Sequence, residues 1–550
     1  MYRVVPVFFL LLLSFFQSKA QVPPASTPPV PTDTLKLVEI IYADRNGFKR
    51  VDSITEYQML VGKVIVKQEN TWFYCDSAVY NKNARIIEAF GNVHINDNDS
   101  VHTYAQYLLY HIDTRMAILK KKVRLTDSRS SLFTEELTYD INQKIGEYKN
   151  GGRVVNGESV LTSKEGTYYA DMKDVYFKKN VELKDPKYKL KSDSLLYNTE
   201  TEIATFISMT HIEDSAKRKI RTREGFYDLK NRKAYFSKRP VIEDGAVMIT
   251  AEQIETDDQT GYNKLKGNAV YKDTAQGIAV LANLIEANRN EGNFRATQHP
   301  LMIIKQDNDS LYVTADTLFS GRLSSLVKVK DSTNTTKDSS MVLKDTVKGT
   351  VVIDSKNKSK DSTDRYFQAY RNVRIFSDSL QAVSDSMFYS GKDSTFQLFT
   401  DPIVWASDNQ ITGDTIYLYT KNKKADRLFV FENGLLINRS GPQMYNQIRG
   451  NRLNGYFVDG NIDRMRARGN AESIYYIKDD NQSLVGVNKA TGDIIELRFL
   501  NKELNKVVFI SEVKGRMFPL SQFPPNEREL RGFKWHSERR PKTKFELFEY

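Results

Sequence analysis

A tyrosine recurs along the first half of this chain at an almost constant interval, and this periodicity constrains the fold more than any other feature of the sequence. Subtraction of the tyrosine numbers gives intervals of 30, 29, 29, 29 and 30 residues. The pieces that end in it can be superposed: Asp76–Tyr80, Gln106–Tyr110, Glu135–Tyr139, Lys164–Tyr168, Asp193–Tyr197 and Arg223–Tyr227. A fixed period of this length indicates a repeat architecture, in which each unit packs on its neighbours.

Each copy of the repeat contains two short runs in which apolar and polar residues alternate, separated by clusters of Asn, Asp, Gly, Lys and Ser. This alternation predicts β-strands, and the period is shorter than the roughly 40 residues of a propeller blade. We therefore predict an all-β fold, an elongated antiparallel β-jellyroll that forms a taco-like stack of two-strand repeats of about 29 residues. If each repeat gives one strand to each of two facing sheets, it advances the stack by about 4.8 Å.

The N-terminus has the features of an export signal. Arg3 precedes the apolar run Val4–Phe16, and Ser18 and Ala20 place small residues before a cleavage site at Gln21. This pattern predicts a secretory signal peptide, so the mature protein is expected outside the cytoplasm.

Composition then divides the chain into six segments. A Ser/Thr/Lys/Asp-rich stretch without aromatic residues interrupts the repeat, and a basic, aromatic tail follows it. The predicted segments are the signal peptide at 1–20, a Pro-rich linker at 21–35, the first part of the jellyroll at 36–321, a low-complexity insertion at 322–363, the second part of the jellyroll at 364–520 and the C-terminal tail at 521–550.

Motifs that carry chemistry are missing from the sequence. The chain has one cysteine, Cys75, which excludes an intrachain disulfide and a Cys-rich zinc site. None of the six histidines lies in an HExxH pair, and there is no Walker loop, nucleophile elbow or dinucleotide-binding fingerprint. The net charge of +11 suits an anionic partner but names none. We therefore expect no enzyme, no catalytic residue, no metal, no cofactor and no nucleic-acid partner.

Strand alternation places a set of apolar side chains from successive copies on one shared face. These residues are Ile87, Ala89, Val93, Ile95, Leu119, Val123, Leu125, Val175, Phe177, Val181 and Leu183. In one interpretation they fill the core of a closed sandwich. In the other they line a slit-like groove with an apolar floor, which shields acyl chains from water. The sequence pattern fits both interpretations.

Short motifs within the repeat resemble the OstA-like family. The motif A-D-x-L-x-Y, followed by a G-N-V strand, is carried best by Ala315–Leu318, Ser192–Tyr197 and Phe90–Val93. The resemblance covers about 36–320 and, more weakly, 365–515. It extends to the LptA type, to the N-terminal domain of the LptD-type translocon and to the long members of the Bacteroidetes type.

The resemblance implies a periplasmic jellyroll that carries lipopolysaccharide or a related glycolipid from the inner to the outer membrane and supports outer-membrane assembly. The acyl chains would lie in the groove, against the apolar residues named above. The resemblance also implies end-to-end pairing of edge strands with other jellyroll proteins of the transport bridge, or with further copies of the chain. It leaves open whether this chain bridges the periplasm or caps the bridge at the outer membrane.

Basic groups near the expected groove mouth are candidate phosphate contacts. They are Lys120, Lys122, Arg124, Lys217 and Arg218. The alternative for these residues is a solvated turn or strand edge. For the whole chain, the alternatives are an outer-membrane β-barrel and an exported β-solenoid with a binding or adhesion role.

Overall fold

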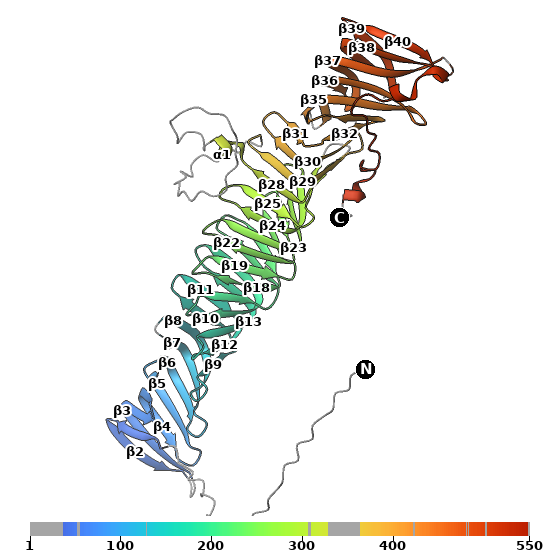
Figure 1. The fold of residues 1–550 in the computed structure, drawn as a ribbon. Coiled ribbons are helices and arrows are strands. Elements are labelled where there is room, and N and C mark those ends of the chain that lie inside the picture. Colours follow the sequence, from blue (N-terminus) through green and yellow to red (C-terminus); the bar gives the residue numbers. More distant parts are fainter. Residues whose placement is uncertain are drawn as a thin grey trace, which may run out of the picture.

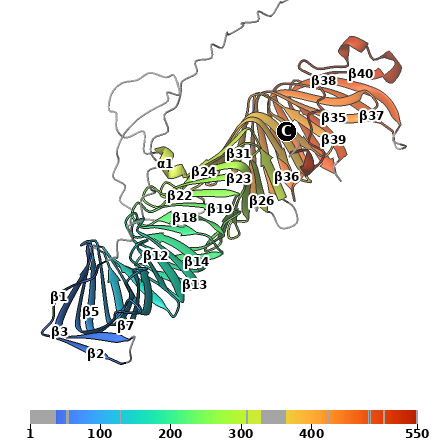
Figure 2. The same cartoon turned by 90° about the horizontal axis from the view of Figure 1, so that it is seen from below.

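The strands of this protein stack one after another along a single long axis (Figures 1 and 2). The structure is a computed structural model, and it describes residues 37–51, 55–127, 129–305, 310–327, 363–421, 424–479, 481, 483–500 and 503–547. The predicted signal peptide, the predicted linker and residues 328–362 of the predicted insertion lie outside the described residues. The described residues form one antiparallel sheet of 40 strands, which confirms the predicted all-β fold.

The sheet is folded along its length, so that two walls face each other. Long strands run through both walls, and shorter strands belong to one wall only. The long strands are β3 (Glu56–Gln68), β4 (Thr71–Asn81), β5 (Ile86–Asp97), β6 (Val101–His111), β7 (Met116–Thr126), β8 (Ser130–Asp140), β13 (Asp174–Lys184), β14 (Tyr188–Asn198), β23 (Tyr262–Asp273), β24 (Ile278–Asn288), β29 (Tyr366–Phe376), β30 (Leu380–Ser390), β35 (Lys424–Gly441), β36 (Met444–Val458), β37 (Asn461–Lys478) and β38 (Leu484–Leu500).

We call the wall that contains the recurring tyrosines wall A and the opposite wall B. The short strands of wall A are β2 (Arg45–Arg50), β9 (Ile145–Tyr148), β12 (Glu165–Tyr169), β15 (Ile203–Phe206), β18 (Glu224–Asp228), β19 (Lys233–Ser237), β22 (Gln253–Asp257), β25 (Asn293–Thr297), β28 (Thr317–Gly321), β31 (Thr395–Phe399), β34 (Thr415–Lys421) and β39 (Glu503–Ile510). Those of wall B are β1 (Glu39–Tyr42), β10 (Gly152–Asn156), β11 (Ser159–Ser163), β16 (Thr210–Asp214), β17 (Lys219–Thr222), β20 (Val241–Asp244), β21 (Val247–Thr250), β26 (Leu301–Lys305), β27 (Ser310–Thr314), β32 (Ile403–Ala406), β33 (Asn409–Thr412) and β40 (Lys514–Pro519). The helical elements are α1 (Leu323–Val327) and the 3₁₀ turns η1 (Leu520–Gln522), η2 (Pro525–Glu527) and η3 (Lys544–Leu547).

The strands are not divided between the two walls in the way just supposed for the repeat, with one strand in each facing sheet. β13 pairs with β14 along its whole length, whereas β14 then pairs with β15 in wall A and with β16 in wall B. A strand therefore crosses from one wall to the other, and both strands of a repeat contribute to both walls. The reason is a bend in the middle of the strand, which the alternation of apolar and polar residues does not reveal.

In alternate long strands, beginning with β3, the bend consists of two consecutive residues in left-handed backbone conformations. In β5 these are Gly91 and Asn92, with φ of 72° and 41°, and the ladder to β6 shifts register between Phe90 and Val93. Glycine and asparagine tolerate this conformation better than other residues. We call the line of bends the corner, and it recurs at Gly62–Lys63, Lys121–Lys122, Lys179–Asn180, Gly267–Asn268, Arg371–Asn372, Glu432–Asn433 and Gly469–Asn470.

The aspartate of the A-D motif fastens the corner. Asn92 Nδ2 donates a hydrogen bond to Asp76 Oδ2 at 2.9 Å, and Asn372 Nδ2 donates to Asp316 Oδ1 at 3.1 Å. The backbone N–H of Asp316 also donates to the carbonyl oxygen of Arg371 at 3.0 Å. The two short motifs of the repeat therefore meet at the corner, where each supplies one partner of the same contact.

The C-terminal tail lies against the outer face of wall B, beside β32 (Figure 1). Gln410 binds the tail backbone twice, since its Nε2 donates to Lys534 O and its Oε1 accepts from the N–H of His536, both at 2.7 Å. Gln447 binds Arg528 O and the N–H of Leu530 in the same way, at 2.8 and 2.7 Å. Wall B is therefore covered on both faces here.

The corner geometry predicts that Asn92→Val destabilises the protein. A β-branched residue in a left-handed conformation costs about 1–2 kcal/mol, and the lost hydrogen bond to Asp76 adds about 1 kcal/mol. Asn92→Gly is the matched control, because it loses the same hydrogen bond but keeps the backbone conformation without strain. Denaturant midpoints should fall further for the valine variant, and equal midpoints for the two variants would contradict this role of the corner.

Candidate functional site

The interior between the walls is a continuous apolar core. Every residue predicted to line a groove lies in this core, and none is more than 7% exposed. Phe177 and Leu119, for example, are fully buried. A cavity beside Phe73 and Tyr110 measures about 10 Å³, which is the space of about one water molecule. In this conformation the side chains pack as in the first of the two interpretations, a filled core.

Polar contacts join the two walls on the side opposite the corner. We call these contacts the mouth seam. They link wall B to wall A through residues 40 to 44 positions apart: Gln68 with Tyr110, Thr71 with Arg115, Asp127 with Tyr168, Asn156 with Tyr197, and Arg218 with Asp258. Three of the recurring tyrosines, Tyr110, Tyr168 and Tyr197, thus contribute their rings to the core and their hydroxyls to the seam.

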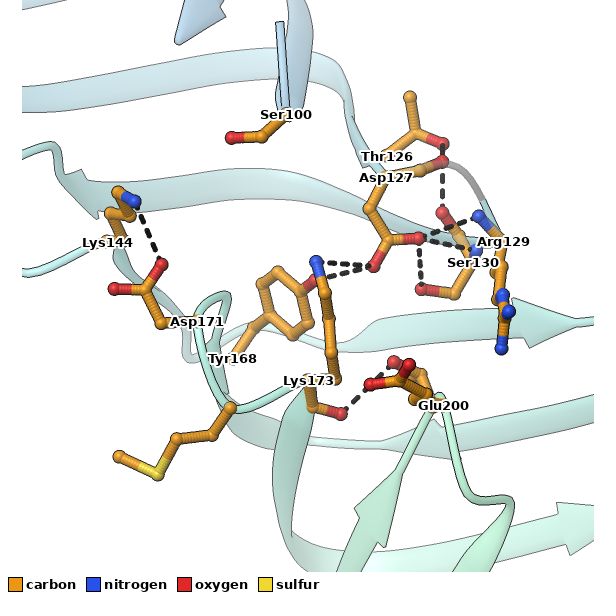
Figure 3. Close-up of polar contacts among 12 residues, drawn as sticks. Ser100, Thr126, Asp127, Arg129, Ser130, Lys144, Tyr168, Asp171, Lys173 and Glu200 are labelled. Carbon is orange, nitrogen blue, oxygen red and sulfur yellow. Dashed lines mark hydrogen bonds and ion pairs between the residues drawn. The ribbon is translucent and has the colours of Figure 1, made fainter. Parts of the chain in front are cut away.

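The Asp127 carboxylate is the best-connected group of the seam (Figure 3). Its Oδ1 accepts hydrogen bonds from the backbone N–H groups of Arg129 and Ser130 at 2.9 and 2.8 Å. Its Oδ2 accepts from the Tyr168 hydroxyl at 2.8 Å and lies 3.7 Å from Lys173 Nζ. Burial acts to raise the pKa of Asp127, but these hydrogen bonds and the lysine charge outweigh it and lower the pKa below its usual value.

The Asp258 carboxylate plays the same part further along the array. The hydroxyls of Tyr188 and Tyr227 both donate to its Oδ2, at 2.9 and 3.0 Å. Arg218 Nη2 donates to its Oδ1 at 3.0 Å, and Arg289 Nη2 lies 3.6 Å away. Burial, with the Asp258 charge, raises the pKa of Tyr188, so its hydroxyl remains a hydrogen-bond donor at neutral pH.

The predicted phosphate contacts are not gathered at one place. Four of the five lie on the surface. Lys120 pairs there with Glu136 at 3.7 Å, and Lys217 pairs with Glu213 at 3.2 Å. Lys122 is exposed at the corner, and the guanidinium of Arg124 lies over the Tyr104 ring.

Arg218 differs from these four, because its side chain is 12% exposed and lines a cavity of about 220 Å³. The carboxylates of the seam were not among the residues predicted from the sequence, nor were Arg289, Arg322 and Arg365, which line the same cavity. Asp127 and Asp258 lie 41 and 40 residues from their seam partners Tyr168 and Arg218, about one and a half repeats, and the period of the sequence carries no signal at that spacing.

Within the described ranges, no helix has the length and hydrophobicity that crossing a bilayer requires. The same residues contain no group of three or more His, Cys, Asp or Glu side chains placed to hold a metal ion.

The seam geometry predicts that Asp127→Asn lowers the free energy of unfolding by about 2 kcal/mol at pH 7, because buried hydrogen bonds to a charged acceptor are weakened. The pKa of Asp127 is lower in the folded than in the unfolded state, so its stabilisation is complete above the unfolded pKa of about 3.9. It is lost as the pH falls from there through the folded pKa. The difference between wild type and variant should therefore shrink below pH 4.

The control for this measurement is Asp171→Asn, drawn in the same view (Figure 3). Asp171 pairs with Lys144 at 2.9 Å, but its side chain is 70% exposed. A surface pair of this kind contributes about 0.5 kcal/mol or less. Equal effects of the two substitutions in denaturant unfolding between pH 3 and 7 would argue against a special role of Asp127.

Comparison with known proteins gives a family match over one segment of this chain and two similar solved structures. No curated protein matches it. Among solved structures, it is similar to LptH from Pseudomonas aeruginosa, described as the LptA-homologous periplasmic component of the conserved lipopolysaccharide transport device. The identity is 17% and the TM-score is 0.18, and the match covers 21% of this chain and 84% of that one. It is also similar to the extracellular domain of a putative one-component system of B. thetaiotaomicron, with 9% identity and a TM-score of 0.11, over 83% of this chain and 92% of that one. Residues 36–193 match the family described as OstA-like protein, which confirms the resemblance carried by the repeated motifs of this segment.

Proposed function

We propose that this protein is a non-enzymatic periplasmic carrier that moves lipopolysaccharide, or a related glycolipid, from the inner to the outer membrane. The observation that carries the proposal is the apolar core, which continues between the walls from Leu60 to Phe499. An interior of this length can shield acyl chains from water at every step along the array. The OstA-like match over residues 36–193 supports the same function.

Because the interior is filled, loading a lipid requires the two walls to part. The corner can act as the hinge, since it joins the walls through backbone that is already bent. The mouth seam consists of polar contacts, and each contributes only about 1 kcal/mol net because water replaces the lost partner when the seam opens. The apolar side chains exposed by opening are then covered by acyl chains instead of by each other.

The two ends of the array have open strand edges that suit pairing with other proteins. In the part of the chain that the structure describes, β1 and β2 pair only with β3 at one end, and β40 pairs only with β38 at the other. An open edge presents unpaired backbone N–H and C=O groups, which a strand from another chain can satisfy. We propose that these edges join the chain to other jellyroll proteins of a transport bridge, or to further copies of itself, and that one end of this bridge reaches the outer membrane.

In-cell photo-crosslinking at Phe177 tests the carrier function. A photo-reactive phenylalanine analogue at this fully buried position should form an adduct with lipopolysaccharide when cells are irradiated, because Phe177 points between the walls. Tyr176 is the matched control, since it is the neighbouring residue of β13 and points to the opposite face. The readout is a gel shift of the purified protein that an antibody against lipopolysaccharide detects.

A strong adduct at position 177 with little or none at 176 is the expected result. Position 93, which is also buried in the core, should behave like position 177. Absence of adducts at both inward positions, in cells where a known lipopolysaccharide-binding protein is labelled, would refute the proposal.

A further inference from the structure

A cavity of about 220 Å³ opens between the walls beside the seam contact of Arg218 with Asp258. The seam contact between Arg218 and Asp258 is followed by the β20–β21 turn of wall B and the β24–β25 turn of wall A. Among the described residues of these two turns, no hydrogen bond or ion pair joins one wall to the other. Apolar side chains from both walls form the floor: Ile242, Ile249, Leu265, Val280, Ile285 and Phe294.

The rim of this cavity carries four arginines and one carboxylate, that of Asp244. Arg218 and Arg289 face Asp258, and Arg218 also pairs with Asp214, so these two arginines are neutralised. Arg322 and Arg365 differ from them. In the part of the chain that the structure describes, neither has a carboxylate within ion-pair distance.

The guanidinium groups of Arg322 and Arg365 converge on one glycine. Arg365 Nη1 donates to the carbonyl oxygen of Gly292 at 3.2 Å. A Cβ atom at Gly292 would lie 2.8 Å from Arg322 Nε, and the φ of this residue is 69°. Two like charges are therefore held against the same turn without a counterion between them. This arrangement is unfavourable unless an anion joins it, and guanidinium pairs bind phosphate through several charge-assisted hydrogen bonds.

We propose that this cavity is a binding site for the phosphate group and one acyl chain of an anionic lipid. Arg322 and Arg365 bind the phosphate at the rim, and the apolar floor takes the chain. The volume is below the roughly 300–1,000 Å³ of pockets that enclose whole drug-sized ligands, so it has room for a segment of one chain and not for a lipid with several chains. The proposal rests on the proposed carrier function, because the phosphate bound here would belong to the headgroup of the carried glycolipid.

Calorimetry on the purified full chain tests the site with defined probes. The probes are 1-lauroyl-lysophosphatidate below its critical micelle concentration, the neutral 1-lauroylglycerol and inorganic phosphate. The lysophosphatidate should bind at least tenfold more tightly than either of the other two, because only this probe uses both the arginines and the apolar floor. Equal affinity for the neutral lipid, or for inorganic phosphate alone, would overturn the proposal.

The double variant R322Q/R365Q should weaken lysophosphatidate binding at least tenfold and leave lauroylglycerol binding unchanged. Its thermal midpoint without ligand should equal or exceed that of the wild type, because two uncompensated like charges are removed. R295Q is the matched control, since Arg295 lies in β25, the strand that follows the Gly292 turn, but pairs with Glu286 on the surface, with a 58% exposed side chain. Unchanged lysophosphatidate affinity in the double variant, or an equal loss in R295Q, would overturn the site.

A second variant tests the apolar floor without changing a charge. Ala287→Phe fills the cavity that Ala287 lines, so it should weaken lysophosphatidate binding and leave the binding of inorganic phosphate unchanged. Lysophosphatidate affinity equal to that of the wild type would overturn the role of the floor.

The failures of the two proposals can be told apart. If lysophosphatidate binds no more tightly than the neutral lipid, while lipopolysaccharide adducts still form at Phe177, this site is overturned and the carrier function stands. Phosphate-dependent lipid binding without any lipopolysaccharide adduct at Phe177 overturns the carrier function and leaves an anionic-lipid site.

Discussion

The rest of this structure depends on the contact between an aspartate and a left-handed pair of residues at the corner. Without the bend, the antiparallel ladder would continue as one open sheet with an exposed apolar face. With the bend at Gly91 and Asn92, fastened by Asp76, each strand folds over itself and the two halves bury the same face. The bend recurs along the array, and the same contact recurs between Asp316 and Asn372 and between Asp414 and Asn433. The core then forms between walls whose spacing the corner has already set.

The two walls are connected differently at the corner and at the mouth seam. At the corner the covalent backbone itself joins them, whereas at the seam they are joined by noncovalent side-chain contacts such as that between Asp127 and Tyr168. Separation of the walls would therefore begin at the seam, where water can replace each lost partner, and would turn about the corner. The Arg218–Asp258 contact adjoins the cavity, and among the described residues no hydrogen bond or ion pair joins the β20–β21 turn to the β24–β25 turn there.

The fold class could be predicted because the alternation of apolar and polar residues occurs in many copies of the repeat. One ambiguous copy therefore does not alter the pattern. It also predicted which apolar residues share the inner face, since Val93 and Phe177 follow the period of two in their strands. Gly or Asn stands at most of the bends, but a bend also occurs at Lys121 and Lys122, which have no general preference for a left-handed conformation, so the composition of these positions did not predict the bend. The seam could not be predicted either, since Asp127 and Tyr168 are 41 residues apart in the sequence, which does not match the period of the repeat.

The tail adds an asymmetry between the walls that bears on how an opening could occur. Gln381, Trp405, Gln410, Ile437 and Gln447 form one cross-strand row on the outer face of wall B. The tail lies over this row, with Arg540 bound to Gln381 and the tail backbone bound to the other two glutamines. Moving wall B in this region would break buried hydrogen bonds on its outer face as well as contacts in the core. The tail makes no such contacts with wall A among the described residues, so moving wall A in the C-terminal part of the array would not break these outer-face hydrogen bonds.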